Sequence, residues 1–327
     1  MKRYNTILIL ALSASAACST KGGGRKDDGK NAPATQPAAV NGGGTGAAGG
    51  CLNLVNGKAS TDYPAVVRLL SKPNSTSVGI CTGTFISPTA VITAAHCLDG
   101  SATGGLYLSG GTSVAFGSHT ISPFAGDVQS LKAFTYGAYG ETGDPNDAAV
   151  TAKDTAIVLF PEGTGSAYMA IGGSLPPVGT TVTSIGYGLT TLSNTTPDPN
   201  YDASKHIGTT KIVTAQDNYN VFVGGVTAQE SAAAAGASVI DSFGDSGGPM
   251  IYNDTVVATL SNGGDGMTSS GRDIWFVTFV DINSVQTKKL INLANQNGAG
   301  IAAPGTAPTT IVTTKTATAA AKTCVAK

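Results

Sequence analysis

Apolar residues between residue 51 and about residue 297 occur in short runs that are rich in β-branched side chains and bounded by Gly, Pro, Asn or Asp. The runs include YPAVVRLL, TGTFISPTAVITAAH, DTAIVLF, TVTSIGYG, PMIYNDTVVATLS and IWFVTFVDI. Runs of this length and composition, separated by turn residues, are typical of β-strands. The pattern therefore predicts an all-β fold made of many short strands.

Helical periodicity is clear only near the end of the chain, in the segment INSVQTKKLINLANQ. Ile282, Val285, Leu290 and Leu293 recur there at about 100° per residue, which places them on one face of a helix. We expect a single C-terminal helix that packs this face against the strands.

The two ends of the chain have a different composition. Residues 19 to about 50 are dominated by Gly, Ala, Pro and Lys and lack large apolar side chains. Such a segment cannot bury enough surface to fold, so residues 18–53 are predicted to be a flexible tether or propeptide. The Thr/Ala-rich residues 298–327 are predicted to be an irregular tail, which leaves 54–297 as the folded domain.

The first 17 residues have the pattern of a signal peptide, because Lys2 and Arg3 precede an apolar stretch too short to span a bilayer. The sequence SAACS that follows resembles a bacterial lipoprotein cleavage site with Cys18 as the lipidated residue, although Ser15 stands where such sites carry Leu. The alternative is an ordinary secretory signal cut nearby at an Ala-x-Ala site. Both interpretations predict export, either as a membrane-anchored lipoprotein or as a free protein.

The composition narrows the function further. The chain has 327 residues, 41% of them hydrophobic, which is enough for one large core or two smaller ones. Its net charge is −1 and it has no basic stripe, so it is not expected to bind nucleic acid. Five cysteines make an odd count, and four remain to pair if one carries lipid. No clustered ligand set indicates a metal or another cofactor.

Candidate chemistry begins with FGDSGGPM, residues 243–250. Glycines on both sides of Ser246 permit unusual backbone angles, and the N–H groups of Gly244 and Ser246 could point together at a developing oxyanion. A serine hydroxyl also needs a base and an orienting group before it acts as a nucleophile. Taken alone, Gly-Asp-Ser-Gly-Gly is equally an ordinary turn sequence.

A base and an orienting group occur in two other stretches. His96 ends the apolar run of TAVITAAH, and Asp154 begins the run DTAIVLF, whereas His119 and His206 lie in polar contexts. Alone, His96 could be a structural histidine and Asp154 a strand-start or capping residue. A buried carboxylate needs a partner, however, and the Nδ1–H of an imidazole provides one. The three stretches together indicate Ser-His-Asp chemistry.

TAAHC, DTAIVLF and GDSGGPM resemble the three catalytic boxes of the chymotrypsin-like, or trypsin-fold, serine peptidases, in the same order along the chain. The resemblance extends from Leu54 to Asn297. It implies two packed six-stranded antiparallel β-barrels with a cleft between them and a C-terminal helix. Together with the lipoprotein-like signal, it indicates a bacterial member of the family that is secreted or lipid-anchored.

The resemblance also implies a role for each catalytic residue. Ser246 would be the nucleophile, His96 the general base and then acid, and Asp154 the orienter of the imidazole. The amides of Gly244 and Ser246 would form the oxyanion hole. The implied activity is that of a serine endopeptidase, which hydrolyses peptide bonds in protein or peptide substrates through an acyl-enzyme.

Four further positions are implied to line the substrate site. Ser261 would lie near Asp154, and Gly263 would pair with the substrate backbone. The residue six before the nucleophile usually sets specificity, and strict counting gives Ile240. A slip of one residue would instead place the Asp241 carboxylate at the pocket base and favour Lys or Arg, unless Asp241 is a solvated loop residue.

Cysteine positions both follow the family pattern and depart from it. The resemblance implies a disulfide between Cys81 and Cys97. The family usually carries a second bridge that begins four residues before the nucleophile, but Ser242 stands there. We expect Cys51 to pair with Cys324, which would keep a lipid-bearing tether attached after processing.

Activation in this family follows cleavage before an apolar residue, whose new amine pairs with the acid preceding the nucleophile. The matching residues are Leu54 and Asp245, and the bond would be Asn53–Leu54. A trypsin-like activator would not cut after Asn, so a different activating protease would be required. The alternative is that no cleavage occurs and Asp245 has another partner.

Two other functions compete with the peptidase interpretation. A catalytically silent binding protein could use the same fold, although such relatives commonly lose the histidine or the serine. An unrelated hydrolase with a Gly-x-Ser-x-Gly nucleophile is excluded by chain order, because its histidine would follow the serine.

Overall fold

The computed structural model describes residues 54–55, 57–71, 79–98, 107–110, 114–116, 128–135, 153–165, 167–189, 204–216, 220–223, 239–267 and 273–306. The predicted signal peptide, the tether and Cys18, Cys51 and Cys324 lie outside these residues. Within the described part of the chain, no helix is both long and apolar enough to cross a membrane.

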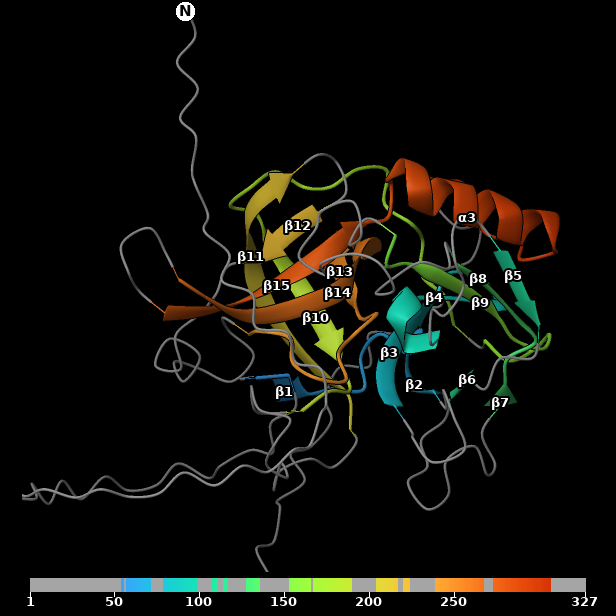
Figure 1. Ribbon diagram of the computed structural model, residues 1–327, viewed down its shortest axis with the longest axis horizontal. Helices are drawn as coiled ribbons and strands as arrows, with labels where there is room; N and C mark the ends of the chain where they lie inside the picture. The colour runs from blue at the N-terminus through green and yellow to red at the C-terminus, as the bar shows by residue number, and fades with distance from the viewer. Residues whose placement is uncertain are drawn as a thin grey trace, which may run out of the picture. The chain divides into compact units, whose positions relative to one another are not determined.

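Eight strands form the first sheet, in the order β5-β8-β9-β4-β3-β2-β6-β7, with every neighbouring pair antiparallel (Figure 1). Their bounds are β2 Val66–Ser71, β3 Gly79–Phe85, β4 Ala90–Thr93, β5 Tyr107–Gly110, β6 Val114–Phe116, β7 Val128–Gln129, β8 Lys132–Thr135 and β9 Ala156–Leu159. The central strands β4 and β9 are buried along their whole length, because they are apolar on both faces.

Seven strands form the second sheet, in the order β1-β11-β10-β13-β14-β15-β12. Their bounds are β1 Lys58–Ala59, β10 Thr181–Gly186, β11 His206–Gln216, β12 Asn220–Val223, β13 Pro249–Tyr252, β14 Thr255–Met267 and β15 Asp273–Asp281. Strand β12 pairs with both β15 and β11, so six of these strands close into a ring and β1 adds to its outside. Antiparallel pairing of all neighbouring strands within the two sheets confirms the predicted fold class.

The β13–β14 hairpin shows how local sequence sets this topology. Its two-residue loop is Asn253-Asp254, with φ of 49° and 55°. Positive φ at both central positions characterises the tight hairpin turn that matches strand twist, and Asn and Asp tolerate it better than most residues. The turn leads from the segment that carries Ser246 directly into β14, which carries Ser261 and Gly263.

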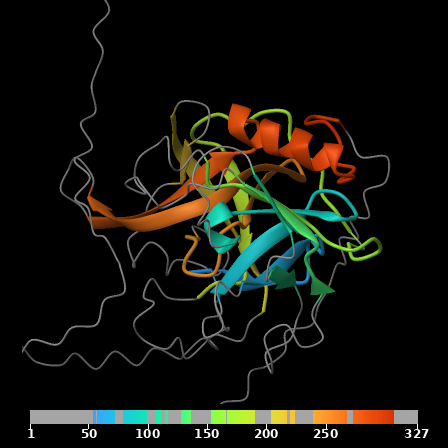
Figure 2. The same ribbon diagram turned by 45° about the vertical axis from the view of Figure 1, so that its right-hand side comes forward.

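Helix α3 (Val285–Gln296) is the predicted C-terminal helix, and it lies beside β8 and β9 (Figures 1 and 2). Ser284 caps its N-terminus by accepting a hydrogen bond from Thr287 N at 3.1 Å. Its buried side chains are those of Thr287, Leu290, Ile291 and Ala294. The Thr287 hydroxyl lies 3.5 Å from that of Thr155, next to Asp154 in the sequence.

The predicted packing face of this helix was partly wrong. Val285 is 66% exposed, because it occupies the first helical position and faces solvent. Ile282 is buried, but in the turn before the helix rather than on it. Packing also continues beyond residue 297, since Ile301 is buried and Gly305 N donates to Ile171 O at 2.9 Å.

Candidate active site

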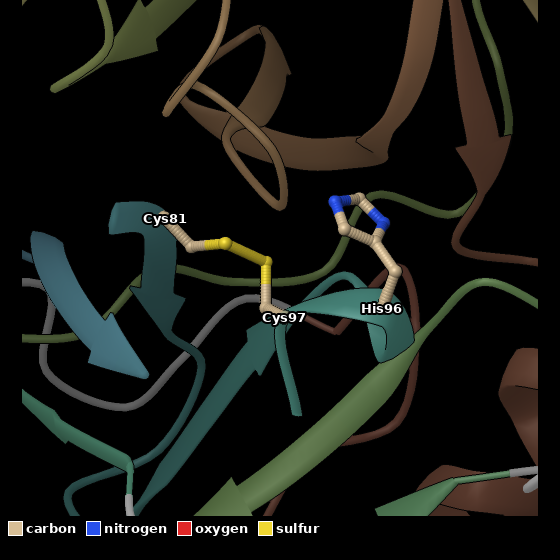
Figure 3. Close-up of side chains that lie close together, drawn as sticks. All are labelled: Cys81, His96 and Cys97. Atoms are coloured by element: carbon tan, nitrogen blue, oxygen red, sulfur yellow. A yellow bond between two sulfur atoms is a disulfide. The ribbon is translucent and has the colours of Figure 1, made fainter. Parts of the chain in front are cut away.

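His96 lies on a single turn of 3₁₀ helix, η1 (Ala95–Leu98), that directly follows the buried strand β4. Cys97, the next residue, forms the expected disulfide with Cys81 of β3, with Cα atoms 6.3 Å apart. Figure 3 shows the imidazole of His96 beside this bridge. The turn is therefore held by β4 on one side and by a covalent link to β3 on the other.

Asp154 lies two residues before β9 and its side chain is 0% exposed. Its Oδ1 accepts a hydrogen bond from His96 N at 2.9 Å, and its Oδ2 lies 2.9 Å from His96 Nδ1. Ser261 Oγ donates to the same Oδ2 at 2.6 Å. Three donors thus compensate the burial of this carboxylate and fix the plane of the imidazole.

The carboxylate also changes the proton affinity of His96. Partial burial, with 30% of the side chain still exposed, lowers the pKa of His96. The negative charge of Asp154 and its hydrogen bond to the ring raise that pKa, and the net shift is above 6.5. The imidazole is therefore primed to accept a proton.

Ser246 lies on the loop that leads into β13. Its carbonyl oxygen accepts a hydrogen bond from Thr82 N at 2.8 Å and lies 3.7 Å from Cys97 Sγ, which carries no proton because it is in the disulfide. Ser246 therefore reaches the corner occupied by His96. Its Oγ makes no hydrogen bond to any described residue, and such bonds are often long in unliganded enzymes.

Close packing around Gly247 holds the Ser246 backbone near Thr82 and Cys97. A Cβ at Gly247 would lie 2.6 Å from Ala94 N and 2.5 Å from Thr82 O, which are backbone atoms that cannot move aside easily. The φ of Gly247 is 79°. Only glycine satisfies both conditions, so its presence after Ser246 reflects contact between the two sheets.

The amides predicted to bind an oxyanion have no competing acceptor among the residues that the structure describes. Gly244 has a φ of 96°, and its carbonyl is held by Thr82 Oγ1 at 3.1 Å. Within the described residues, the N–H groups of Gly244 and Ser246 donate to no protein acceptor. Both amides therefore retain the capacity to bind a negatively charged oxygen.

Asp245 is fully buried and stabilises the Ser246 loop through hydrogen bonds to backbone N–H groups. Its Oδ1 accepts from Gly188 N at 2.7 Å and its Oδ2 from Ser242 N at 2.8 Å. A Cβ at Gly188 would lie 2.6 Å from both Asp245 Cγ and Asp245 N, so the carboxylate fits only because that side chain is absent. Burial, followed by the nearby charge of Asp241, raises the pKa of Asp245 well above its ordinary value.

The two candidate specificity residues are both buried. Ile240 belongs to the hydrophobic cluster of the second sheet, together with Met250 and Phe279. Asp241 is 1% exposed, and Ser184 Oγ donates to its Oδ1 at 2.5 Å. Burial raises the pKa of Asp241 to about 6, although the hydrogen bond from Ser184 opposes the shift.

The segment expected to form a new N-terminus is also buried. Leu54 is 0% exposed with a φ of 56°. Val55 forms an antiparallel bridge with Ile240, and Ile240 N donates to Val55 O at 3.2 Å. This bridge brings the start of the predicted domain against the loop that carries Ser246.

Sequence reasoning missed Thr82 and Ser184. Thr82 links the loop to β3 through Ser246 O and Gly244 O, and its Oγ1 accepts from Tyr187 N at 3.1 Å. Neither residue has a local sequence signal, because their partners lie more than 50 residues away. The exposed Gly263, by contrast, occupies β14 as expected, opposite Val277 of β15.

One further cluster could suggest a metal site. A nitrogen of His96 and the sulfur atoms of Cys81 and Cys97 lie within 4.8 Å of one another. The two sulfurs are bonded to each other, so neither is a thiolate able to bind a metal ion. The cluster is the Cys81–Cys97 disulfide together with the neighbouring His96, which are described above.

The chain belongs to the trypsin family, which matches residues 54–285. A trypsin from Sarcophaga bullata is 30% identical over 218 residues, which are 64% of this chain and 78% of that protein. The family match covers every residue discussed in this section.

Solved structures resemble the chain at lower identity. The scabies mite inactivated protease paralogue S-D1 matches with a TM-score of 0.50 and 16% identity, over 76% of this chain and 99% of that one. A Glu endopeptidase solved in complex with MPD matches with a TM-score of 0.45 and 16% identity, over 75% of this chain and 100% of that one. At 16% identity, the likeness to the scabies mite paralogue shows a shared fold and nothing more.

Proposed function

We propose that the chain is an exported serine endopeptidase in which Ser246, His96 and Asp154 form the catalytic triad. The observation that carries this proposal is the Asp154 carboxylate, which is buried and binds both His96 N and His96 Nδ1 at 2.9 Å. A carboxylate held in this way fixes the ring tautomer and leaves Nε2 as the proton acceptor. The contact of the Ser246 backbone with Thr82 and Cys97 gives further support.

In the first half of the reaction, Ser246 Oγ attacks the scissile carbonyl carbon while His96 Nε2 takes the hydroxyl proton. The new Oγ–C bond leaves a tetrahedral oxyanion, which the amides of Gly244 and Ser246 stabilise. One such donor is worth about 3 kcal/mol of barrier, or at least a hundredfold in rate. The C–N bond then breaks, and His96 gives its proton to the leaving amine.

In the second half, His96 removes a proton from water as the water attacks the acyl carbon. Collapse of the second oxyanion breaks the Oγ–C bond and returns the proton to Ser246. Gly263, on the exposed part of β14, is proposed to pair with the substrate backbone. The substrates are accordingly proteins or peptides, and no cofactor takes part in the scheme.

The chain is further proposed to be made as a zymogen, activated by hydrolysis of Asn53–Leu54. The support is the burial of Leu54 and the Val55–Ile240 bridge, which join this segment to the Ser246 loop. Lipid on Cys18 and a Cys51–Cys324 disulfide would keep the processed enzyme at a membrane. A propeptide that separates from the processed chain without reductant would remove the disulfide from this proposal.

A silent binding protein is the second candidate, since one structural relative is named an inactivated protease paralogue. The residues of the present chain favour the enzyme, because His96, Asp154 and Ser246 are all retained. A binding protein has no need for a carboxylate that orients an imidazole.

Labelling with a fluorophosphonate distinguishes the two candidates. The processed protein is expected to react at Ser246, and Ser246→Ala is expected to abolish the label. Ser242→Ala, which changes another serine of the same loop, is the matched control and should keep the label. If the folded, processed chain stays unlabelled, the binding protein is the better description.

A further inference from the structure

Two buried carboxylates lie on one short loop, four residues apart. Asp245 accepts hydrogen bonds from the backbone N–H groups of two other residues, whereas Asp241 accepts one from Ser184 Oγ at its Oδ1 and interacts with its own backbone N–H. The other oxygen of Asp241, Oδ2, is buried and has no hydrogen-bond partner in the described part of the chain. An unpartnered, buried carboxylate oxygen costs several kcal/mol unless a cation or a proton reaches it.

Neither carboxylate has a basic partner within the described residues, where no Lys or Arg forms an ion pair with Asp241 or Asp245. The neighbouring strand brings His206 opposite Gly186, and its Nδ1 lies 3.3 Å from Ser204 O. Lys205 directs its Nζ to Tyr63 O instead. The loop therefore carries up to two negative charges and lacks a fixed positive one.

The missing cation can come from the start of the domain. Val55 and Ile240 are antiparallel partners, so the register places Leu54 opposite Asp241. Leu54 is completely buried, and its φ of 56° is unfavourable for a residue with a branched side chain. Hydrolysis of the preceding peptide bond would abolish that torsion and leave a charged nitrogen in the same place.

We propose that Asp241 and Asp245 together form a two-carboxylate receptor for the α-ammonium of Leu54. The inference rests on the proposed zymogen and extends it, because it assigns Asp241 to activation rather than to the substrate pocket. Hydrolysis of Asn53–Leu54 consumes one water and yields a carboxylate on Asn53 and an ammonium on Leu54. Before hydrolysis a proton neutralises one acid of the pair, and afterwards the ammonium binds between them.

The first experiment measures the proton affinity of the new N-terminus. Asn53→Lys lets added trypsin generate the Leu54 terminus in every variant. The pKa of the Leu54 amine follows from the pH dependence of its carbamylation by cyanate. We expect Asp241→Asn to lower this pKa by about one unit, because one of two nearby negative charges is lost. Asp241→Glu should restore most of the shift.

Asp281→Asn is the matched control, because Asp281 is also buried with its pKa raised to about 6, mainly by burial, but lies on β15. It should leave the amine unchanged. If Asp241→Asn leaves the amine titration unaltered, the proposal is wrong. Reduced cleavage after Lys or Arg relative to apolar residues would then identify Asp241 as a pocket residue. A natural processed chain that does not begin at Leu54 also overturns it.

A second experiment avoids changing Asp241. In the uncut Ser246→Ala protein, the raised pKa values of both carboxyls mean that stability falls as pH rises from about 4 through about 6 and beyond. The same protein cut before Leu54 should lose less stability over this range, because the ammonium compensates the ionised pair. Identical pH dependence of the two melting curves would refute the receptor. Both readouts are independent of catalysis, so they remain interpretable if Ser246 proves unreactive.

Discussion

The two halves of the candidate site are held by different kinds of interaction. On the first sheet, His96 is fixed by a disulfide through its neighbour Cys97 and by the buried carboxylate of Asp154. On the second sheet, the loop of Ser246 has no disulfide among its described residues and is held by Asp245 and Asp241, both buried.

This difference gives the halves different sensitivities. A covalent bridge does not respond to pH, but a reductant can break it. Buried carboxylates with raised pKa values respond to pH and to any cation that reaches them. Ser242 stands where the family usually has a cysteine, and its backbone N–H donates a hydrogen bond to Asp245 Oδ2. The first half should therefore be redox-sensitive, and the second sensitive to protonation and processing.

The largest expected effect comes from breaking the first half at Asp154. Asp154→Asn keeps the size of the side chain but can stabilise the wrong imidazole tautomer. We expect kcat to fall by about 10⁴ while the fold is kept. Peptide hydrolysis by the processed enzyme provides the measurement, and a loss below tenfold would contradict the assigned role. Asp254→Asn, on the exposed β13–β14 turn, is the control.

Removing the covalent link should have the next largest effect. Cys81→Ser with Cys97→Ser opens a loop with a sequence separation of 16, for which chain entropy predicts a loss of about 3 kcal/mol in the free energy of unfolding. Urea denaturation with and without reductant tests the same bond when it is done on a Cys51→Ser variant, which lacks the proposed Cys51–Cys324 bridge. If neither treatment changes the midpoint, the disulfide does not stabilise the His96 corner.

A smaller effect is expected from the second half. Gly188→Ala would place a methyl group 2.6 Å from Asp245 N and 2.7 Å from Phe243 O. Overpacking against backbone atoms costs about 1–3 kcal/mol and should displace the Ser246 loop. Thermal unfolding and fluorophosphonate labelling should decline together. Gly173→Ala is the control, because an added Cβ there comes no closer than 3.4 Å to another residue and, as at Gly188, the backbone is not in the left-handed region.

The mildest test varies pH without any substitution. The pKa of His96 is raised above 6.5 after the opposing effects of burial and Asp154 are combined. Protonated His96 cannot accept the Ser246 proton, so kcat/KM should fall as pH drops through a value above 6.5. An acid limb centred below 6 would show that Asp154 does not stabilise the charged ring in solution.

The sequence predicted the candidate catalytic residues better than it predicted the contacts that hold them in place. His96, Asp154 and Ser246 were recognisable because each stands in a motif with a fixed order along the chain. The disulfide from Cys81 to Cys97 followed from the same resemblance. The strands were predicted from apolar runs, but the face of α3 was misjudged because Val285 occupies its first turn.

The hydrogen bonds that hold the Ser246 loop in place had no comparable motif in the sequence. Asp241 could be placed beside Ser184 only after β10 and the loop were in position, since 57 residues separate them. The bonds of Asp245 involve the backbone of Gly188 and Ser242, which any residue can supply. Counting from Ser246 likewise could not show that Ile240 packs in the hydrophobic cluster of the second sheet.

Helix α3, at the C-terminal end of the domain, contacts the segment that carries Asp154. Thr287 touches Thr155, the neighbour of Asp154, and Leu290 and Ile291 are buried. A ribosome makes the chain from its N-terminus, so this helix is synthesised long after Asp154. A nascent chain that ends before Val285 therefore has the carboxylate but lacks the helix that packs beside β9 and contacts Thr155.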